Sequence, residues 1–201
     1  MTGHVLRRSD GSIWQLKSEK WGVEESSKVM SGMIEIRKEE PADQDAVRII
    51  NEIAFEQGPE AAIVDKLRKS CKEYCSFVAV NQDTVMGHIL FTPVTIDGSN
   101  LIGMGLAPVA VLPLYQKQGI GSSLVRHGLQ HLQRSGCPFV IVLGHPEYYP
   151  RFGFEQASHY KLKCQWKGVP DEAFMVVIFD RDVLPREGGI TRYRAEFDEA
   201  M

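Results

Sequence analysis

The segment from Val109 to Leu124 constrains the fold of this chain more than any other stretch of the sequence. It begins with an apolar run typical of a strand, and the run ends at Pro113, which cannot continue a central strand. A short polar turn containing Gly119 and Gly121 follows, and an amphipathic helix begins there. A strand, a glycine turn and a helix in direct succession predict an α/β architecture.

The same turn has the chemistry of an anion-binding site. The first amides of a helix have no acceptors within the helix and lie at the positive end of its dipole. Gly119 and Gly121 leave room for a phosphate to approach the backbone, and Lys117 adds a positive charge beside them. The alternative is a helix start built from small residues that binds nothing. The preceding strand and the amphipathic helix favour the anion site.

Two familiar phosphate motifs are excluded by the residues at this turn. A Walker loop needs a Gly-Lys-Ser or Gly-Lys-Thr run, and the chain contains neither. The dinucleotide fingerprint GxGxxG needs a third glycine where Leu124 stands, and several predicted strands precede the turn. The pattern that remains is Q-x-x-G-x-G, from Gln116 to Gly121.

Hydrophobic periodicity predicts a mixed α/β sheet around this unit. The expected order is βααβββαβαβ, with an additional strand near 160–164 left open. The predicted strands cover 34–37, 77–80, 85–91, 101–111, 139–143 and 174–179. Three of the predicted helices open at Pro41, after Gly58-Pro59 and at Gly119, and the order places a fourth between the last two strands.

Composition excludes several classes of protein. With 43% apolar and 24% charged residues and a net charge of −3, the chain is neither disordered nor a nucleic-acid binder that acts through a generally basic surface. No apolar run approaches the roughly 18–20 residues that span a bilayer. The N-terminal part has no signal-peptide core, and the four cysteines form no CxxC pair. We therefore expect a cytoplasmic protein with reduced thiols, without a nucleic-acid or membrane partner, as a monomer or homodimer.

The recognisable patterns lie between residues 33 and 183, which we expect to form one domain. Residues 1–32 have no sustained apolar period and are predicted to be an extension outside the core, with a short strand near 12–16 as the alternative. Residues 184–201, in which arginines alternate with acidic residues, are predicted to be a solvated C-terminal tail.

These motifs resemble those of the GNAT superfamily of N-acetyltransferases. The family signature is [QR]-x-x-G-x-[GA] after a strand of the form VxVxPxY[QR], which residues 109–116 match position by position. Residues 148–154, Tyr-Tyr-Pro-Arg-Phe-Gly-Phe, resemble the family segment Y-x-x-x-G-F. Residues 85–94 and 143–149 are similar to a bacterial subgroup of predicted acetyltransferases with poorly defined substrates.

The resemblance implies an acyl-CoA N-acyltransferase fold with a splayed central sheet and acetyl-CoA as cosubstrate, without a metal. Acetyl-CoA would lie between the strands at 106–111 and 139–143, with its pantetheine arm paired to one of them like an added strand. An amide near Val109 would polarise the thioester carbonyl. The implied cofactor-binding residues are Val109, Ala110, Val111, Gln116, Lys117, Gln118, Gly119, Ile120, Gly121 and Ser122.

Tyr149 matches the position at which the family often places its general acid. A phenol with an unperturbed pKa of about 10 stays protonated at neutral pH and can donate its proton to the CoA sulfur. The alternative is an aromatic side chain that only packs against Phe152 and Phe154. Tyr148 is the neighbouring competitor, and only one of the two is expected to face the cleft.

The general base is less defined by the sequence. His145 follows a predicted buried strand, where α/β sites tend to form, and histidine is a common general base in enzymes that work near neutral pH. A loop histidine without a role and proton loss through ordered water are the alternatives. The other candidates are His88, Glu147, Glu56 and Glu60.

The leading functional hypothesis is therefore direct transfer of an acetyl group from acetyl-CoA to a primary amine of a small molecule, a peptide N-terminus or a lysine. The first alternative is a non-catalytic acyl-CoA-binding or regulatory module, which would not need Tyr149. A P-loop or dinucleotide enzyme is the second. His127 and His131 are four residues apart on the predicted helix, but no third ligand accompanies them, which favours a solvated helix face over a metal site.

Overall fold

A mixed sheet, mostly antiparallel, forms the centre of the computed structural model, which describes residues 34–56 and 59–200. The predicted N-terminal extension, residues 1–32, lies outside the described residues. The strand order is β1-β2-β3-β4-β5-β8-β6, and β9 pairs with both β3 and β7. The strands are β1 (Glu35–Lys38), β2 (Cys75–Asn81), β3 (Thr84–Ile96), β4 (Ile102–Val111), β5 (Phe139–Leu143), β6 (Glu155–Gln156), β7 (Leu162–Cys164), β8 (Phe174–Ile178) and β9 (Gly189–Arg192).

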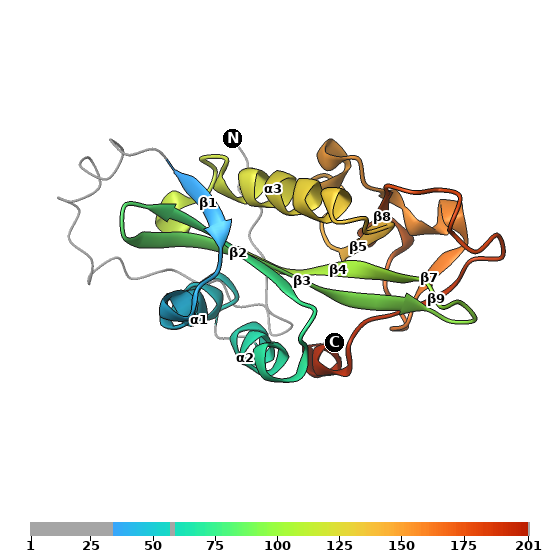
Figure 1. Ribbon diagram of the computed structural model, residues 1–201, viewed down its shortest axis with the longest axis horizontal. Helices are drawn as coiled ribbons and strands as arrows, with labels where there is room; N and C mark the ends of the chain where they lie inside the picture. The colour runs from blue at the N-terminus through green and yellow to red at the C-terminus, as the bar shows by residue number, and fades with distance from the viewer. Residues whose placement is uncertain (1–33, 57–58, 201) are drawn as a thin grey trace, which may run out of the picture. The chain divides into compact units, whose positions relative to one another are not determined.

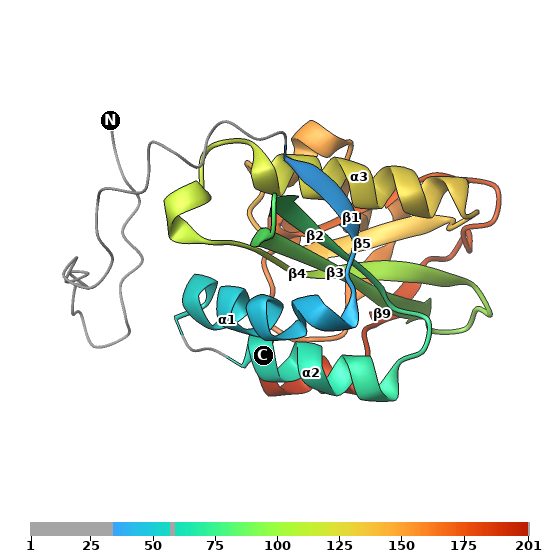
Figure 2. The same ribbon diagram turned by 60° about the vertical axis from the view of Figure 1, so that its left-hand side comes forward.

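Helices cover both faces of this sheet (Figures 1 and 2). Helices α1 (Gln44–Ala54) and α2 (Glu60–Ser70) lie on one face, and α3 (Ile120–Arg134) lies on the other. Each helix buries an apolar stripe against the strands, which removes that surface from water. For α3 the buried stripe is Ile120, Leu124, Val125, Leu129 and Leu132. The predicted mixed α/β fold is confirmed.

The predicted elements differ from the observed ones mainly at their ends. β5 has the predicted bounds, whereas β3 continues past the predicted end at residue 91 and passes through Pro93. Pro93 is tolerated because the last pair between β2 and β3 is Cys75 with Phe91, so Pro93 lies beyond the end of β2. The helix predicted between β5 and β8 is a series of short 3-10 turns, Tyr149–Phe152 and Ala157–Tyr160.

The parallel pair β4 and β5 separates along its length, as the expected splayed sheet requires. Their pairing runs from Met104 with Val140 to Leu106 with Val142, while β4 continues to Val111. Immediately after Leu106, two residues of β4, Ala107 and Pro108, lie opposite Leu90 alone in β3. Such a bulge bends its strand, and proline has no amide hydrogen for a ladder hydrogen bond. The bulge therefore marks the point where β4 leaves β5.

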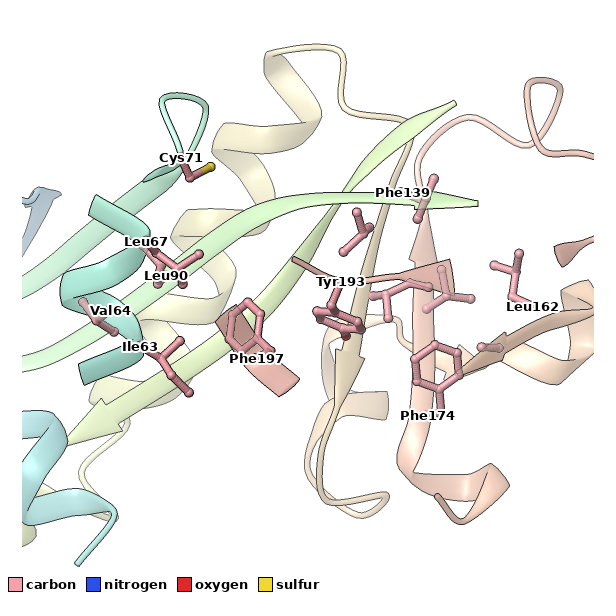
Figure 3. Close-up of a cluster of buried hydrophobic side chains, with 14 of the residues drawn as sticks. Ile63, Val64, Leu67, Cys71, Leu90, Phe139, Leu162, Phe174, Tyr193 and Phe197 are labelled. Carbon is pink, nitrogen blue, oxygen red and sulfur yellow. The ribbon is translucent and has the colours of Figure 1, made fainter. Parts of the chain in front are cut away.

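The C-terminal segment is part of the fold, contrary to the prediction of a solvated tail. β9 pairs with Thr95 and Ile96 of β3, beyond the end of β2. After β9, Tyr193 and Phe197 are buried in the core, where Figure 3 shows them between the apolar side chains of α2 and those of β5 and β8. The alternating charges of this segment lie on its exposed side, where Arg192 forms an ion pair with Asp97.

Replacing Phe197 with alanine tests this packing. The side chain is 7% exposed, so its removal should lower the free energy of unfolding by about 3–4 kcal/mol through lost burial and a residual cavity. Urea denaturation followed by circular dichroism measures the change. The control is Glu199→Ala, since Glu199 makes only an exposed ion pair with Lys66 and should change stability by less than about 0.5 kcal/mol. Equal stability of the two variants would contradict the buried position of Phe197.

Candidate active site

The turn between β4 and α3 is braced by two glutamine side chains. Gln116 donates its Nε2 hydrogen to the Val111 carbonyl oxygen at 3.0 Å, and Gln118 donates to the Leu114 carbonyl oxygen at 3.0 Å. Because these amide groups are engaged within the turn, Gln116 and Gln118 fix its shape. A ligand at the turn therefore meets main-chain amides rather than these side chains.

Helix α3 begins with amides that have no partner. The Ser123 amide is the first to bond back, to the Gly119 carbonyl oxygen at 2.9 Å. Within the described residues, no backbone hydrogen bond engages the amides of Ile120, Gly121 and Ser122. These amides lie at the positive end of a fifteen-residue helix. The arrangement is the anion-binding geometry that the sequence predicts.

Gly119 shapes this helix start in a way that a side chain would not allow. Its φ of 88° is left-handed, and an added Cβ would meet no atom within 4 Å. Lys117 is also left-handed, with φ 61°, and its side chain is exposed at the same turn. The open space over Gly119 and the exposed ammonium group of Lys117 leave the amides accessible to a phosphate.

A cavity of about 420 Å³ opens where β4 and β5 separate. We name it the β4–β5 cavity. Its walls combine main chain from both strands with side chains from α2, the turn after β5 and the C-terminal segment. The lining residues are Phe55, Glu60, Ile63, Leu106, Ala107, Pro108, Val109, Leu143, Gly144, His145, Tyr149, Trp166, Tyr193 and Phe197.

Tyr149 lies in the wall of the β4–β5 cavity and is 6% exposed. Its ring lies against Gly144, where an added Cβ would stand 2.3 Å from a ring carbon, so any side chain at that position would displace the tyrosine. Burial raises the pKa of Tyr149 above the ordinary value of a phenol. The hydroxyl is therefore protonated at neutral pH and is available as a proton donor.

The neighbouring Tyr148 takes a different position. Its hydroxyl oxygen lies 3.2 Å from the point where a Cβ on Gly121 would stand, at the start of α3. The Tyr148 and Tyr149 rings are perpendicular, with centroids 5.1 Å apart. Within the described residues, Tyr149 faces the β4–β5 cavity, whereas Tyr148 is not among the side chains that line it.

His145 also lines the β4–β5 cavity, and its side chain is exposed. Its carbonyl oxygen accepts hydrogen bonds from the amides of Tyr148 at 3.0 Å and Tyr149 at 3.4 Å. The His145 main chain therefore orients both tyrosines. Its position in the same cavity wall as Tyr149 is compatible with the predicted role as base.

The structure separates the other base candidates. His88 is fully buried outside the β4–β5 cavity and contacts Asn51 Nδ2 at 3.1 Å and Ser76 Oγ at 3.0 Å. Burial lowers the pKa of His88, which keeps the ring neutral. These contacts indicate a structural role for His88.

Among the acidic candidates, Glu56 and Glu147 are exposed and do not line the β4–β5 cavity, but Glu60 does. The Glu60 Oε2 atom is buried and has no hydrogen-bond partner among the described residues. The sequence included Glu60 as one of several candidates, without a pattern that distinguished it from Glu56.

Sequence reasoning missed four aromatic side chains of the β4–β5 cavity: Phe55, Trp166, Tyr193 and Phe197. They come from three separate parts of the chain, and no local motif connects them. One signal was present in the C-terminal segment. Tyr193 and Phe197 are four residues apart, a spacing typical of one buried face, but the charged residues around them favoured the prediction of a solvated tail.

Among the described residues, no group of three or more His, Cys, Asp or Glu side chains is arranged to hold a metal ion. His127 and His131 instead pack edge-on against Phe77, with ring centroids 4.9 and 5.2 Å apart. Over the part of the chain that the structure describes, no helix is both long and apolar enough to span a membrane.

A sheet that parts beside an anion-binding helix start, with a buried tyrosine in the gap, defines an acyltransferase of the GNAT type. The family model described as an acetyltransferase (GNAT) domain matches residues 35–157, and this chain belongs to that family. The resemblance drawn from the turn and from the Tyr-rich segment is confirmed.

Bacterial relatives resemble the chain over most of its length. The uncharacterized N-acetyltransferase YhbS of Escherichia coli K12 is 36% identical over 164 residues, covering 81% of this chain and 98% of YhbS. The crystal structure of Escherichia coli YhbS in complex with CoA superimposes with a TM-score of 0.78 at 34% identity, covering 84% of this chain and 93% of that one. A GNAT acetyltransferase of Brucella melitensis in complex with acetyl-CoA gives a TM-score of 0.69 at 36% identity, covering 83% and 99%.

The buried His88 makes folding stability depend on pH. Because its pKa is lowered in the folded protein, the unfolded chain takes up a proton below about pH 6.5 that the folded protein does not. The free energy of unfolding therefore decreases as the pH falls, by up to about 1.4 kcal/mol at pH 5.5 from this one group. Urea denaturation at pH 7.5 and pH 5.5 measures the decrease.

The matched variant is His88→Gln, which removes the titrating ring. It should be less stable than the wild type at pH 7.5, because the buried hydrogen bonds are altered. Its further loss between pH 7.5 and pH 5.5 should be smaller by up to about 1.4 kcal/mol. The same loss in both proteins would mean that His88 titrates alike in the folded and unfolded chains.

Proposed function

We propose that this chain transfers the acetyl group of acetyl-CoA directly to a primary amine. The observation that carries the proposal is the continuity of one short stretch of chain, from Leu106 to Ser122. Within it, β4 leaves β5, and the strand then runs into a turn and the unpartnered amides of α3. An elongated cosubstrate fits this arrangement, because its amide-containing arm can pair with the exposed strand and its pyrophosphate can meet the helix amides. The CoA and acetyl-CoA complexes of the two solved relatives support the assignment.

The cosubstrate is held mainly by backbone in this proposal. Main-chain groups of Val109, Ala110 and Val111 pair with the pantetheine arm. The amides from Gln118 to Ser122, including those of Gly119, Ile120 and Gly121, bind the pyrophosphate. Lys117 supplies a positive charge beside it, and Gln116 holds the turn through its hydrogen bond to Val111.

Tyr149 acts as the general acid in the transfer. The amine nitrogen attacks the thioester carbonyl, for which an amide near Val109 stabilises the developing oxyanion. The leaving thiolate then takes the proton of the Tyr149 hydroxyl. Burial of Tyr149 supports this role, because it keeps the phenol protonated until the thiolate forms. His145 remains a candidate for the base.

The second candidate function is a non-catalytic acyl-CoA-binding module. A binder needs the turn but not a protonated tyrosine in a cavity next to the parted strands, and this position of Tyr149 favours the enzyme. Incubation of the protein with acetyl-CoA, a panel of amines and a thiol reporter distinguishes the two functions. Amine-dependent release of CoA is expected, whereas CoA binding without release for any amine would support the binding module.

The Tyr149→Phe variant tests the general acid. We expect kcat to fall about 100-fold, because loss of a positioned proton donor typically costs 10²–10⁴. The dissociation constant for acetyl-CoA, measured by calorimetry, should stay within about twofold, since the pyrophosphate site is untouched. Tyr148→Phe, the neighbouring hydroxyl deletion, is the control and should change kcat much less. A normal kcat in Tyr149→Phe would mean that Tyr149 only packs against its neighbours and is not the general acid.

The Gly119→Asp variant tests the phosphate site. A carboxylate at the start of α3 repels the pyrophosphate and competes for the amides, so affinity for acetyl-CoA should fall at least tenfold, about 1.4 kcal/mol. Gly98→Asp is a matched control, because Gly98 also has a positive φ, of 78°, and open space at its Cβ. Both variants carry the same backbone strain and the same added charge. An equal loss of acetyl-CoA affinity in both variants would contradict the proposal that this turn binds the pyrophosphate.

A further inference from the structure

Over residues 34–56 and 59–200, one carboxylate lies in the wall of the β4–β5 cavity. Glu60 begins α2, and its Oε2 atom is buried without a hydrogen-bond partner among the described residues. Among the residues that the structure describes, no lysine or arginine lines the cavity, so this part of the chain supplies no permanent cation for the carboxylate. A buried polar atom without a partner costs free energy, and in a native protein it indicates a ligand or a role.

Aromatic rings line the same cavity as this carboxylate. The Trp166 and Tyr193 rings lie 5.2 Å apart at 32°, and the Tyr193 and Phe197 rings lie 5.8 Å apart. Together with Phe55 and Tyr149 they form the aromatic part of an otherwise largely aliphatic lining. The Tyr193 hydroxyl is also buried without a partner among the described residues, which gives the cavity a second unengaged polar group.

Hydrogen bonds fix the Trp166 side chain and the Tyr193 main chain. Trp166 Nε1 donates to Asp198 Oδ1 at 2.9 Å, and the Tyr193 amide donates to Gln165 Oε1 at 2.7 Å. The indole N–H of Trp166 is thus already used. What Trp166 presents to a ligand is the ring itself, which attracts cations and apolar groups.

The charge and size of the β4–β5 cavity limit what it accepts. Aromatic walls with one carboxylate attract an ammonium group through both the net charge and the ring quadrupoles. An apolar body fits the remaining lining, and the described lining residues offer no further carboxylate for a second cationic group. The volume of about 420 Å³ corresponds to about a dozen water-sized groups at ~30 Å³ each. Part of this volume lies along Ala107–Val109, on the proposed acetyl-CoA side.

We propose that the β4–β5 cavity is the acceptor site, that the Glu60 carboxylate binds the ammonium group of the acceptor, and that the acceptor is a small primary amine with one positive charge on an aromatic or aliphatic body. This inference rests on the proposed function, because Tyr149 and Val109 belong to the same cavity. It selects the small-molecule class from the three kinds of amine that the sequence left open.

The proton balance of the transfer follows from these positions. Glu60 accepts one proton from the ammonium group, and the free amine then attacks the thioester carbonyl. The C–N bond forms, the C–S bond breaks, and Tyr149 gives its proton to the departing sulfur. The second proton of the nitrogen returns to the Tyr149 oxygen, and Glu60 releases its proton to solvent. One amide, one thiol and one solvent proton result.

The Glu60→Gln variant tests this assignment, since it removes the charge and keeps the size of the side chain. With benzylamine as acceptor, KM should rise at least tenfold. With aniline, which is uncharged at neutral pH and needs no ammonium site, kcat/KM should stay within about threefold of the wild type. The dissociation constant for acetyl-CoA and the circular dichroism spectrum should be unchanged. Glu56→Gln, the exposed neighbour, is the matched control and should behave like the wild type.

Binding measurements separate this inference from the proposed function. Calorimetry with the CoA-saturated protein should show benzylamine binding at least tenfold tighter than benzyl alcohol, and Glu60→Gln should abolish that preference. A preference without acetylation would contradict the proposed function and leave the ammonium site in place. Acetylation with no effect of Glu60→Gln on benzylamine KM, or equal losses with aniline or in Glu56→Gln, would overturn the role of Glu60 alone.

Discussion

The divergence of β4 from β5 is the constraint on which the rest of this structure depends. Pairing stops at Leu106 with Val142, and the two-residue bulge at Ala107 and Pro108 turns β4 away. The divergence leaves backbone groups without a strand partner in the middle of the sheet, and it opens the β4–β5 cavity. It also aims the end of β4 at the turn whose amides begin α3. The proposed cosubstrate site and the proposed acceptor site therefore have one structural origin.

The sequence predicted the parts of this arrangement that are local. The strand, turn and helix from Val109 onward are specified by periodicity, by Pro113 and by glycines close together in the chain. Tyr149 was predicted through its motif, and the structure adds its burial and its contact with Gly144. These features depend on neighbours a few residues away.

Other features depend on packing between distant segments and left no local trace. Glu60 and Glu56 are equivalent in sequence terms, and only the fold places one of them in a cavity wall. The C-terminal segment was predicted to be solvated because its charges are frequent. Its two apolar anchors, Tyr193 and Phe197, gain their burial from strands and a helix far away in the chain. The bulge at which β4 leaves β5 likewise could not be predicted, because it is defined by the register between β4 and β3.

The two sides of the β4–β5 cavity are built in different ways. The proposed cosubstrate side is one continuous segment, from Leu106 to Ser122, and main-chain groups make most of its proposed contacts with the cosubstrate. The opposite side is assembled from side chains of α2, the loop at Trp166 and the segment after β9. Substitutions on that side can change the acceptor while the backbone that holds the common cosubstrate stays intact. Such a division allows one scaffold to diversify its substrates during evolution by a few side-chain replacements, without rebuilding its chemistry.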